Sequence, residues 1–403
     1  MMRRLPLAYI VYFGAVGAAF PYLPVFYRDL GLDFNAIGIV AALQAASQLV
    51  MAPIWGGLAD RFPHSRLTLP AAALFACAGA VILLTATDLL GAVLGAVIGG
   101  VILFAGLAGI GPVLDARTLE LLGSDRGRYG QARAWGSAAF VVSATVVGVV
   151  LDREGPRSIF AVYVPALLLT ALVTAFLPRR GMTRSASLTR GARTVLAAPG
   201  LALFLGGVFL VWTALSGLNA FYSIQVVALG GGATLVGVAW ALGAVVEVPI
   251  MFGFARLGTR FGNERIVILG AFTFALRSLL AALARDPAAL VAVSVLEGFS
   301  FACFFVGGVT YIARLAPTNL AGTAQGLFAA VAGLATIVGS SLGGVVADWL
   351  TIPGLFAVAA GLHLVAAFVI AFAIRRGPGP RLRPMAAMAG GPPLPATGDP
   401  PGP

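Results

Sequence analysis

Long apolar runs of about twenty residues each repeat along the chain from residue 5 to residue 374. At a rise of about 1.5 Å per residue, a helix of this length crosses the roughly 30 Å hydrocarbon core of a bilayer. Because 60% of the 403 residues are hydrophobic and 10% are charged, too little polar surface exists to coat a water-soluble globule. Helices satisfy their own backbone hydrogen bonds in lipid, so we expect an all-α integral membrane protein rather than a β-barrel.

Counting these runs predicts twelve transmembrane helices. Their approximate ranges are 5–27, 35–58, 67–86, 89–113, 131–151, 157–177, 200–228, 234–255, 265–284, 288–312, 320–347 and 352–374. Cys77 and Cys303 both fall inside predicted spans, so neither a disulfide framework nor a cysteine-rich metal site is expected.

Arginine is the strongly basic residue of this chain, which contains no lysine, and its distribution over the loops is uneven. One side of the predicted membrane carries Arg3, Arg4, Arg61, Arg66, Arg126, Arg128, Arg179, Arg180, Arg184, Arg190, Arg193, Arg260, Arg375, Arg376, Arg381 and Arg383, and the other carries Arg28, Arg153, Arg157 and Arg285. The positive-inside rule therefore places both termini in the cytoplasm. Because topology accounts for the net charge of +11, no nucleic-acid partner is expected.

The two parts of the chain repeat one another. A shift of 199 positions aligns "LADRFPHSR" at 58–66 with "LGTRFGNER" at 257–265. Transporters commonly consist of two related six-helix halves. We therefore predict an N-terminal half over 1–177, a cytoplasmic linker over 178–199, a C-terminal half over 200–376 and a Pro- and Gly-rich disordered cytoplasmic tail over 377–403.

The polar loop after the second predicted span contains Gly56, Asp60 and Arg61 in the pattern G-x-x-x-D-R, with Arg66 following. Twelve spans in two halves with this loop resemble the major facilitator superfamily, whose signature there is G-x-x-x-D-R-x-G-R-R; this chain has Pro63 in place of the later glycine. The resemblance implies that the loop locks the halves together on the cytoplasmic side and releases for inward opening. We interpret Asp60 as a gating residue that meets the N-terminal dipole of the eleventh span, whereas the arginines fit gating and topology equally well.

Three further segments narrow the resemblance. "FPYLPVFYRDLG" at 20–31, "YGQARAWGSAAF" at 129–140 and "VLEGFSFACFFVGGVTYI" at 295–312 look like the phenylpropionate-permease and nucleoside-symporter branch, which is itself similar to lactose permease. The superfamily resemblance covers roughly residues 5 to 376 and implies the twelve-helix fold of that family.

Charged residues inside the predicted spans are few, and each costs roughly 2.5–3.5 kcal/mol on insertion scales. Glu247, Arg277 and Glu297 fall near the membrane midplane on three consecutive spans. A carboxylate next to a guanidinium can alternate between protonated and ionised forms as access changes, which is the minimal chemistry of proton coupling. "FALRSLL" matches the region of lactose permease with an essential arginine, although Ser300 falls where that protein has its proton-carrying glutamate. A static ion-pair network that holds the three helices together is the alternative.

Uncharged polar residues at similar depth predict a substrate cavity formed by Tyr22, Gln44, Gln48, Asn219 and Tyr222. Individually, such residues also fit plain hydrogen bonds between helices. Asp115 and Arg133 are a second candidate pair, because lactose permease holds its sugar with an acid and an arginine on the same two helices. Both residues lie close to the predicted cytoplasmic boundary, so a structural or gating ion pair fits equally well.

These residues favour a proton-coupled symporter that imports a small organic solute (an aromatic acid, a nucleoside or a sugar) by alternating access, acting as a monomer in a bacterial cytoplasmic membrane. A proton-driven exporter of the same fold is the alternative, although the fifth predicted span lacks the Gly-Pro motif of drug antiporters. No H-E-x-x-H, G-x-S-x-G or phosphate-binding G-x-x-x-x-G-K-[ST] motif occurs. We therefore expect no enzymatic activity, metal or cofactor.

Overall fold

The protein is described here by a computed structural model of residues 4–62, 65–122, 129–178, 200–315 and 320–376. Across these ranges the chain is helical and contains no strand. The first part forms α1 (Arg4–Ala19), α2 (Leu23–Asp29), α3 (Phe34–Arg61), α4 (Thr68–Leu89), α5 (Ala92–Leu122), α6 (Tyr129–Glu154), a short 3-10 turn (Pro156–Ser158) and α7 (Ile159–Ala175). The second part forms α9 (Leu201–Ala228), α10 (Ala233–Phe261), α11 (Asn263–Leu283), α12 (Pro287–Leu315) and α13 (Ala321–Arg376).

The first predicted span is broken into two helices. Pro21 lies in the turn that separates α1 from α2, and Pro24 lies in the first turn of α2. Proline has no backbone N–H to continue the preceding helix, but it is well suited to begin a new one. Together α1 and α2 still form one apolar stretch, Leu5–Asp29, that is long enough to cross a membrane.

The last helix, α13, contains two predicted spans. It has 56 residues, so it would be about 84 Å long if straight, far more than one crossing needs. At Thr351 the backbone leaves helical geometry, with φ 68° and ψ 170°, and the chain turns back. The eleven long apolar helical stretches of the described residues therefore provide twelve crossings, which confirms the predicted all-α membrane fold.

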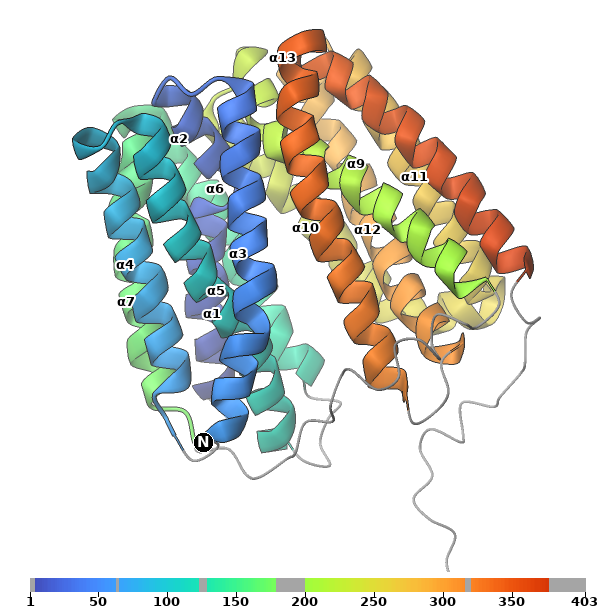
Figure 1. Ribbon diagram of the computed structural model, residues 1–403, viewed down its shortest axis with the longest axis horizontal. Coiled ribbons are helices and arrows are strands. Elements are labelled where there is room, and N and C mark those ends of the chain that lie inside the picture. The colour runs from blue at the N-terminus through green and yellow to red at the C-terminus, as the bar shows by residue number, and fades with distance from the viewer. Residues whose placement is uncertain (1–3, 63–64, 123–128, 179–199, 316–319, 377–403) are drawn as a thin grey trace, which may run out of the picture.

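Figure 1 shows two bundles of helices: α1 to α7 form the first bundle on one side, and α9 to α13 form the second bundle on the other. The groups contact one another chiefly through α3 with α13 and α6 with α10, and more lightly through α2 with α9. They converge at the end of the molecule away from the N-terminus and diverge toward the end that carries it (Figure 1). The linker and tail fall almost wholly on 179–199 and 377–403, outside the described residues, so the predicted division into halves stays a prediction.

Small residues bring neighbouring helices close together within each bundle. In lipid, van der Waals packing and hydrogen bonds hold helices together, because the surrounding tails are as apolar as the side chains. The packed surface between α4 and α5 illustrates this, and it contains the buried residues Ala72, Ala76, Gly79, Gly95, Gly99 and Gly106. Among the described residues, α3 and α10 begin 199 positions apart, at Phe34 and Ala233, in agreement with the shift that aligns the sequence repeat.

Candidate functional site

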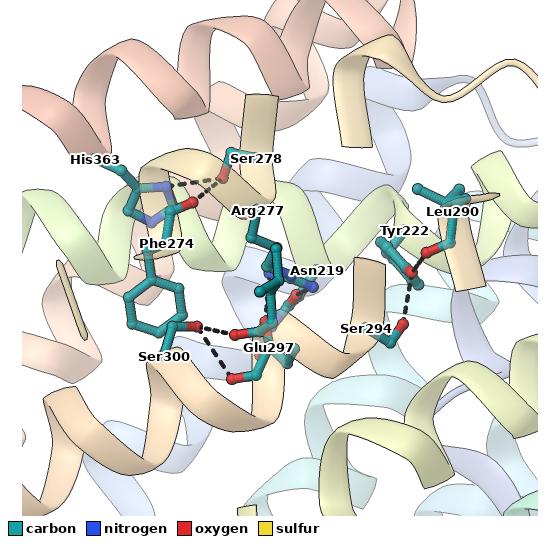
Figure 2. Close-up of polar contacts among 11 residues, drawn as sticks. Asn219, Tyr222, Phe274, Arg277, Ser278, Leu290, Ser294, Glu297, Ser300 and His363 are labelled. Carbon is teal, nitrogen blue, oxygen red and sulfur yellow. Dashed lines mark hydrogen bonds and ion pairs between the residues drawn. The ribbon is translucent and has the colours of Figure 1, made fainter. Parts of the chain in front are cut away.

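An ion pair joins the middle of α11 to the middle of α12. The Nη1 atom of Arg277 lies 2.5 Å from Oε2 of Glu297, and the two side chains are 3% and 19% exposed. Figure 2 shows the pair between the helices, with the guanidinium directed away from the helix that carries it. Opposite charges that are so deeply buried stabilise one another only as a pair, so the loss of either partner leaves the other uncompensated.

The second bundle supplies further contacts that orient Arg277. Its Nη2 atom donates to Oδ1 of Asn219 at 3.3 Å, and its guanidinium lies 5.4 Å from the centre of the Tyr222 ring. The Tyr222 hydroxyl donates to the carbonyl of Leu290 at 2.5 Å and lies 2.7 Å from the hydroxyl of Ser294. The arginine is therefore held by α9 as well as α12, and these contacts fix the direction in which its guanidinium group points (Figure 2).

Behind the arginine lies a polar pair that does not reach the ion pair. Nδ1 of His363, a fully buried residue of α13, lies 2.9 Å from the hydroxyl of Ser278, and its ring stacks on Phe274 with ring centres 5.3 Å apart. The hydroxyl of Ser300 donates to backbone carbonyls of its own helix (Figure 2). The first contact joins α11 to α13 and the second lies within α12, and neither involves the carboxylate of Glu297.

A cavity of about 380 Å³ opens beside the ion pair, within the size range of small-molecule sites. Its described lining comprises Phe20, Phe140, Trp212, Leu215, Asn219, Tyr222, Ala239, Trp240, Gly243, Ala244, Glu247, Arg277, Ser294, Glu297 and Phe301. Within the lining, Phe20 and Phe140 come from the first bundle and the other residues come from the second. The hydrogen-bonding side chains of the described cavity wall thus all belong to the second bundle.

Glu247 of α10 lines the same cavity as the ion pair. Among the described residues it has no ion-pair partner within 4.0 Å, in contrast to Glu297. The sequence argument from depth therefore brought together three residues, Glu247, Arg277 and Glu297, that the structure places around one cavity.

The predicted cavity residues are divided by the structure. Asn219 and Tyr222 line the cavity, whereas Tyr22, Gln44 and Gln48 do not. The Tyr22 hydroxyl donates to the carbonyl of Ala144, and Gln44 donates to the Tyr27 hydroxyl at 2.6 Å. Because a polar residue in a span can face a neighbouring helix as easily as a cavity, sequence depth alone does not separate these cases.

Asp115 and Arg133 lie outside the cavity lining, nearer the ends of α5 and α6. Asp115 accepts a hydrogen bond from the Tyr9 hydroxyl at 2.6 Å, and Arg133 lies 3.8 Å from the centre of the Phe13 ring. Among the described contacts, no ion pair joins the two charges directly. Their predicted role in holding substrate or in gating stays a prediction.

The predicted gating residues surround the end of α3. Gly56 and Asp60 are half-buried in its last turns, and Arg61 and Arg66 are exposed. The sequence interpretation did not single out Arg117 of α5, a buried residue whose Nη2 atom donates to the carbonyl of Ser65 at 3.0 Å and so ties the loop to the first bundle. The start of the eleventh span, which Asp60 is predicted to meet, lies partly outside the described residues, at 316–319.

The sequence interpretation did not single out Ser294 or the aromatic residues Trp212, Trp240 and Phe301 of the cavity lining, although helical spacing from the polar residues of the site would have found them. Ser294 lies three residues before Glu297, and Phe301 lies four residues after it. Trp240 lies seven residues before Glu247. Relative to Asn219, Trp212 again lies seven before. Residues at these spacings share one face of a helix, so a charged residue that faces a cavity marks its neighbours on the same stripe.

Twelve crossings in two packed bundles, with a buried charged cavity near the middle, define a polytopic membrane transporter. The profile of the family described as "MFS_1 like family" matches residues 2–358, and the chain belongs to this family. The maltose permease of Geobacillus stearothermophilus is 33% identical over 348 residues, which are 84% of this chain and 86% of the permease. The probable 3-phenylpropionic acid transporter of Escherichia coli (strain K12) is 26% identical over 77% of this chain and 82% of that protein.

Solved structures confirm the fold. The crystal structure of a point mutant of the nucleoside transporter NupG superimposes with a TM-score of 0.79 at 17% identity and covers 92% of this chain and 98% of that one. At this identity the likeness establishes the fold alone. Because the relatives and structural neighbours are membrane transporters and permeases, the protein is a multi-pass membrane transporter and not an enzyme.

Replacing Asp60 by asparagine is expected to leave folding intact and to shift the population toward the conformation open on the predicted cytoplasmic side, because the charge that would meet a helix N-terminus is lost. Labelling of cysteines introduced near the ends of α5 and α12 measures this shift. Asp88→Asn is the control, because Asp88 pairs with Arg157 at 2.5 Å within the first bundle. Unchanged labelling and transport in Asp60→Asn would assign Asp60 to topology.

Proposed function

We propose that the protein is a proton-coupled symporter of a small uncharged organic solute, such as a sugar or nucleoside, that works by alternating access. The observation that carries this proposal is the buried ion pair between Arg277 and Glu297, whose charged atoms lie 2.5 Å apart. The pair borders a cavity that Glu247 also lines. A buried charge pair beside a cavity is costly in a membrane, and such groups commonly mark substrate and proton pathways.

The charges of the lining favour an uncharged solute. The described wall contains two carboxylates and one guanidinium. An anionic solute would add a further negative charge at short range, where Coulomb repulsion is only weakly screened by solvent. The sugar relatives agree with this, since the maltose permease and the raffinose permease of Escherichia coli align with 84% and 93% of this chain.

The two sides of the cavity favour an amphipathic solute. The first bundle offers the phenyl rings of Phe20 and Phe140, whereas the second offers Asn219, Arg277 and the two acids. A sugar or nucleoside has polar edges that can bind hydrogen-bonding groups and a flatter apolar face that can pack on aromatic rings. We infer that the solute binds the second bundle through its polar edge and is enclosed by the rings of the first.

Proton coupling follows from competition for Arg277. A solute oxygen that accepts a hydrogen bond from the guanidinium weakens its hold on Glu297, and the carboxylate, left without its partner, can then take up a proton. Solute and proton would therefore occupy the cavity together. In the same proposal, the protein functions as a monomer in a bacterial cytoplasmic membrane with both termini in the cytoplasm, in line with the arginine distribution and the bacterial relatives.

The test uses purified protein in liposomes that contain a pH-sensitive dye, with maltose, uridine and 3-phenylpropionate added separately. Proton movement in the same direction as the solute, produced by maltose or uridine and not by 3-phenylpropionate, is the expected result. A response to 3-phenylpropionate alone would overturn the charge argument. Proton movement opposite to the solute would identify the exporter. If none of the three solutes produced proton movement, the proposal of coupling would be overturned.

A further inference from the structure

Two carboxylates bind helix N-termini across the boundary between the bundles, at the end of the molecule away from the N-terminus. We propose that Asp152 and Asp348 form a pair of related clamps that hold this end of the transporter closed. Neither residue lines the cavity, so the proposal depends neither on the solute nor on proton coupling. The bundles converge at this same end (Figure 1).

The Asp152 clamp joins the end of α6 to the start of α10. Its Oδ1 atom accepts from the backbone N–H of Ala233 at 2.5 Å, and its Oδ2 atom accepts from the backbone N–H of Thr234 at 3.1 Å and from the Thr234 hydroxyl at 2.5 Å. The residue before α10 is Gly232, which has no side chain to cap the helix. A carboxylate of the other bundle therefore satisfies the exposed N–H groups of this helix and meets the positive end of its dipole.

The Asp348 clamp joins the middle of α13 to the start of α3. Its Oδ2 atom accepts from the backbone N–H of Asn35 at 3.0 Å. Here the helix also has a cap of its own, because Asp33 accepts from the backbone N–H of Ala36 at 2.6 Å. The second clamp therefore contributes one bond to a helix that is already capped, and we expect it to be the weaker of the two.

The same short pattern produces both clamps. The sequence reads "GVVLD" at 148–152 and "GVVAD" at 344–348, so each acid follows a glycine by four residues and lies on the same helix face. A Cβ atom added to Gly148 would lie 2.8 Å from Cα of Thr234, and one added to Gly344 would lie 3.0 Å from Cα of Asn35. The absence of a side chain at each glycine lets the other helix approach closely enough for the acid to reach its first turn.

Opening this end requires both clamps to separate. In the closed form each carboxylate is bound to N–H groups of the other bundle, and in the open form those groups must be satisfied by water. The clamps therefore bias the equilibrium toward closure at this end, in proportion to the capping bonds that each provides. No bond to a solute or a proton is needed for this bias.

The experiment measures the distance between spin labels on the two bundles at this end. Cysteines at Glu154 and Arg285, both exposed, would carry the labels in a background with Cys77 and Cys303 replaced by alanine. Asp152→Ala is expected to raise the ratio of long to short distances about fivefold, the effect of losing a typical helix cap. Asp348→Ala should raise it less, Asp152→Asn should lie between Asp152→Ala and the parent, and the double alanine variant should exceed both single variants.

Asp88→Ala is the matched control, since this acid is exposed at the same end but pairs with Arg157 of its own bundle. If Asp152→Ala does not fold, Thr234→Val tests the same clamp by removing one of its three bonds, and a shift to longer distances is expected again. Folded Asp152→Ala and Asp348→Ala proteins with the distances of the parent would overturn the proposal. So would an equal shift in Asp88→Ala.

Discussion

Replacing Glu297 by glutamine is expected to abolish uphill accumulation of solute while leaving binding and exchange intact. Glutamine has the shape of the protonated acid, and its amide oxygen can still accept a hydrogen bond from Arg277, but it cannot take up or release a proton. With a gradient of one pH unit, 1:1 symport can accumulate solute about tenfold, since one unit corresponds to about 1.4 kcal/mol. The variant should only equilibrate the solute.

Proteoliposomes with an imposed pH gradient measure this, with maltose as the probe, and counterflow measures exchange. Glu264→Gln is the control, because Glu264 pairs with Arg314 at 3.3 Å on a partly exposed surface and lies outside the cavity lining. Accumulation by Glu297→Gln equal to that of the parent would show that Glu297 is not the proton carrier, and Glu247 would be tested next. Joint loss of binding, accumulation and thermal stability would indicate a static ion pair.

Replacing Arg277 by glutamine is expected to have the largest effect on stability, because it leaves the Glu297 carboxylate buried without its guanidinium. Removing one partner of a buried ion pair typically costs about 3–5 kcal/mol. The double variant Arg277→Gln/Glu297→Gln removes both charges of this pair, so most of this loss should be recovered. Solute binding should not return, since the donors of Arg277 toward Asn219 and the cavity are absent in both variants.

Thermal unfolding of the parent, the two single variants and the double variant in detergent provides the thermodynamic cycle, and solute binding is measured on the same samples. A strong coupling between the two positions is expected. Additive single effects would contradict the view that the two charges stabilise one another. Recovery of solute binding in the double variant would remove Arg277 from the proposed solute contacts.

The membrane fold could be predicted because span length and depth follow directly from residue number. Apolar runs predicted the crossings, yet they did not reveal the turn at Phe20–Tyr22 within the first span. The break at Thr351 lies inside α13, a helix of 56 residues that is apolar on both sides of it. In both cases the break is a local change in backbone direction that leaves hydropathy almost unchanged.

The candidate site was only partly predictable. Depth along each span identified Glu247, Arg277 and Glu297 as cavity residues. The same argument placed Gln44 in the cavity, but Gln44 faces a neighbouring helix. It did not predict that Trp212 and Trp240 line the cavity. In water, a polar and an apolar face distinguish the outside of a helix from its inside. In lipid both faces are apolar, so the orientation of a residue around the helix axis leaves little trace in the sequence.

The sequence by itself determined the number of crossings, the repeat at a shift of 199 and the depth of each charge in the membrane, because all three depend only on position along the chain. The tertiary structure decided which acid binds Arg277, which bundle supplies the polar wall of the cavity, and that Asp152 and Asp348 reach across to helices of the other bundle. These depend on how each helix is rotated about its axis and how the bundles meet. Packing between distant segments, rather than local sequence, sets that arrangement.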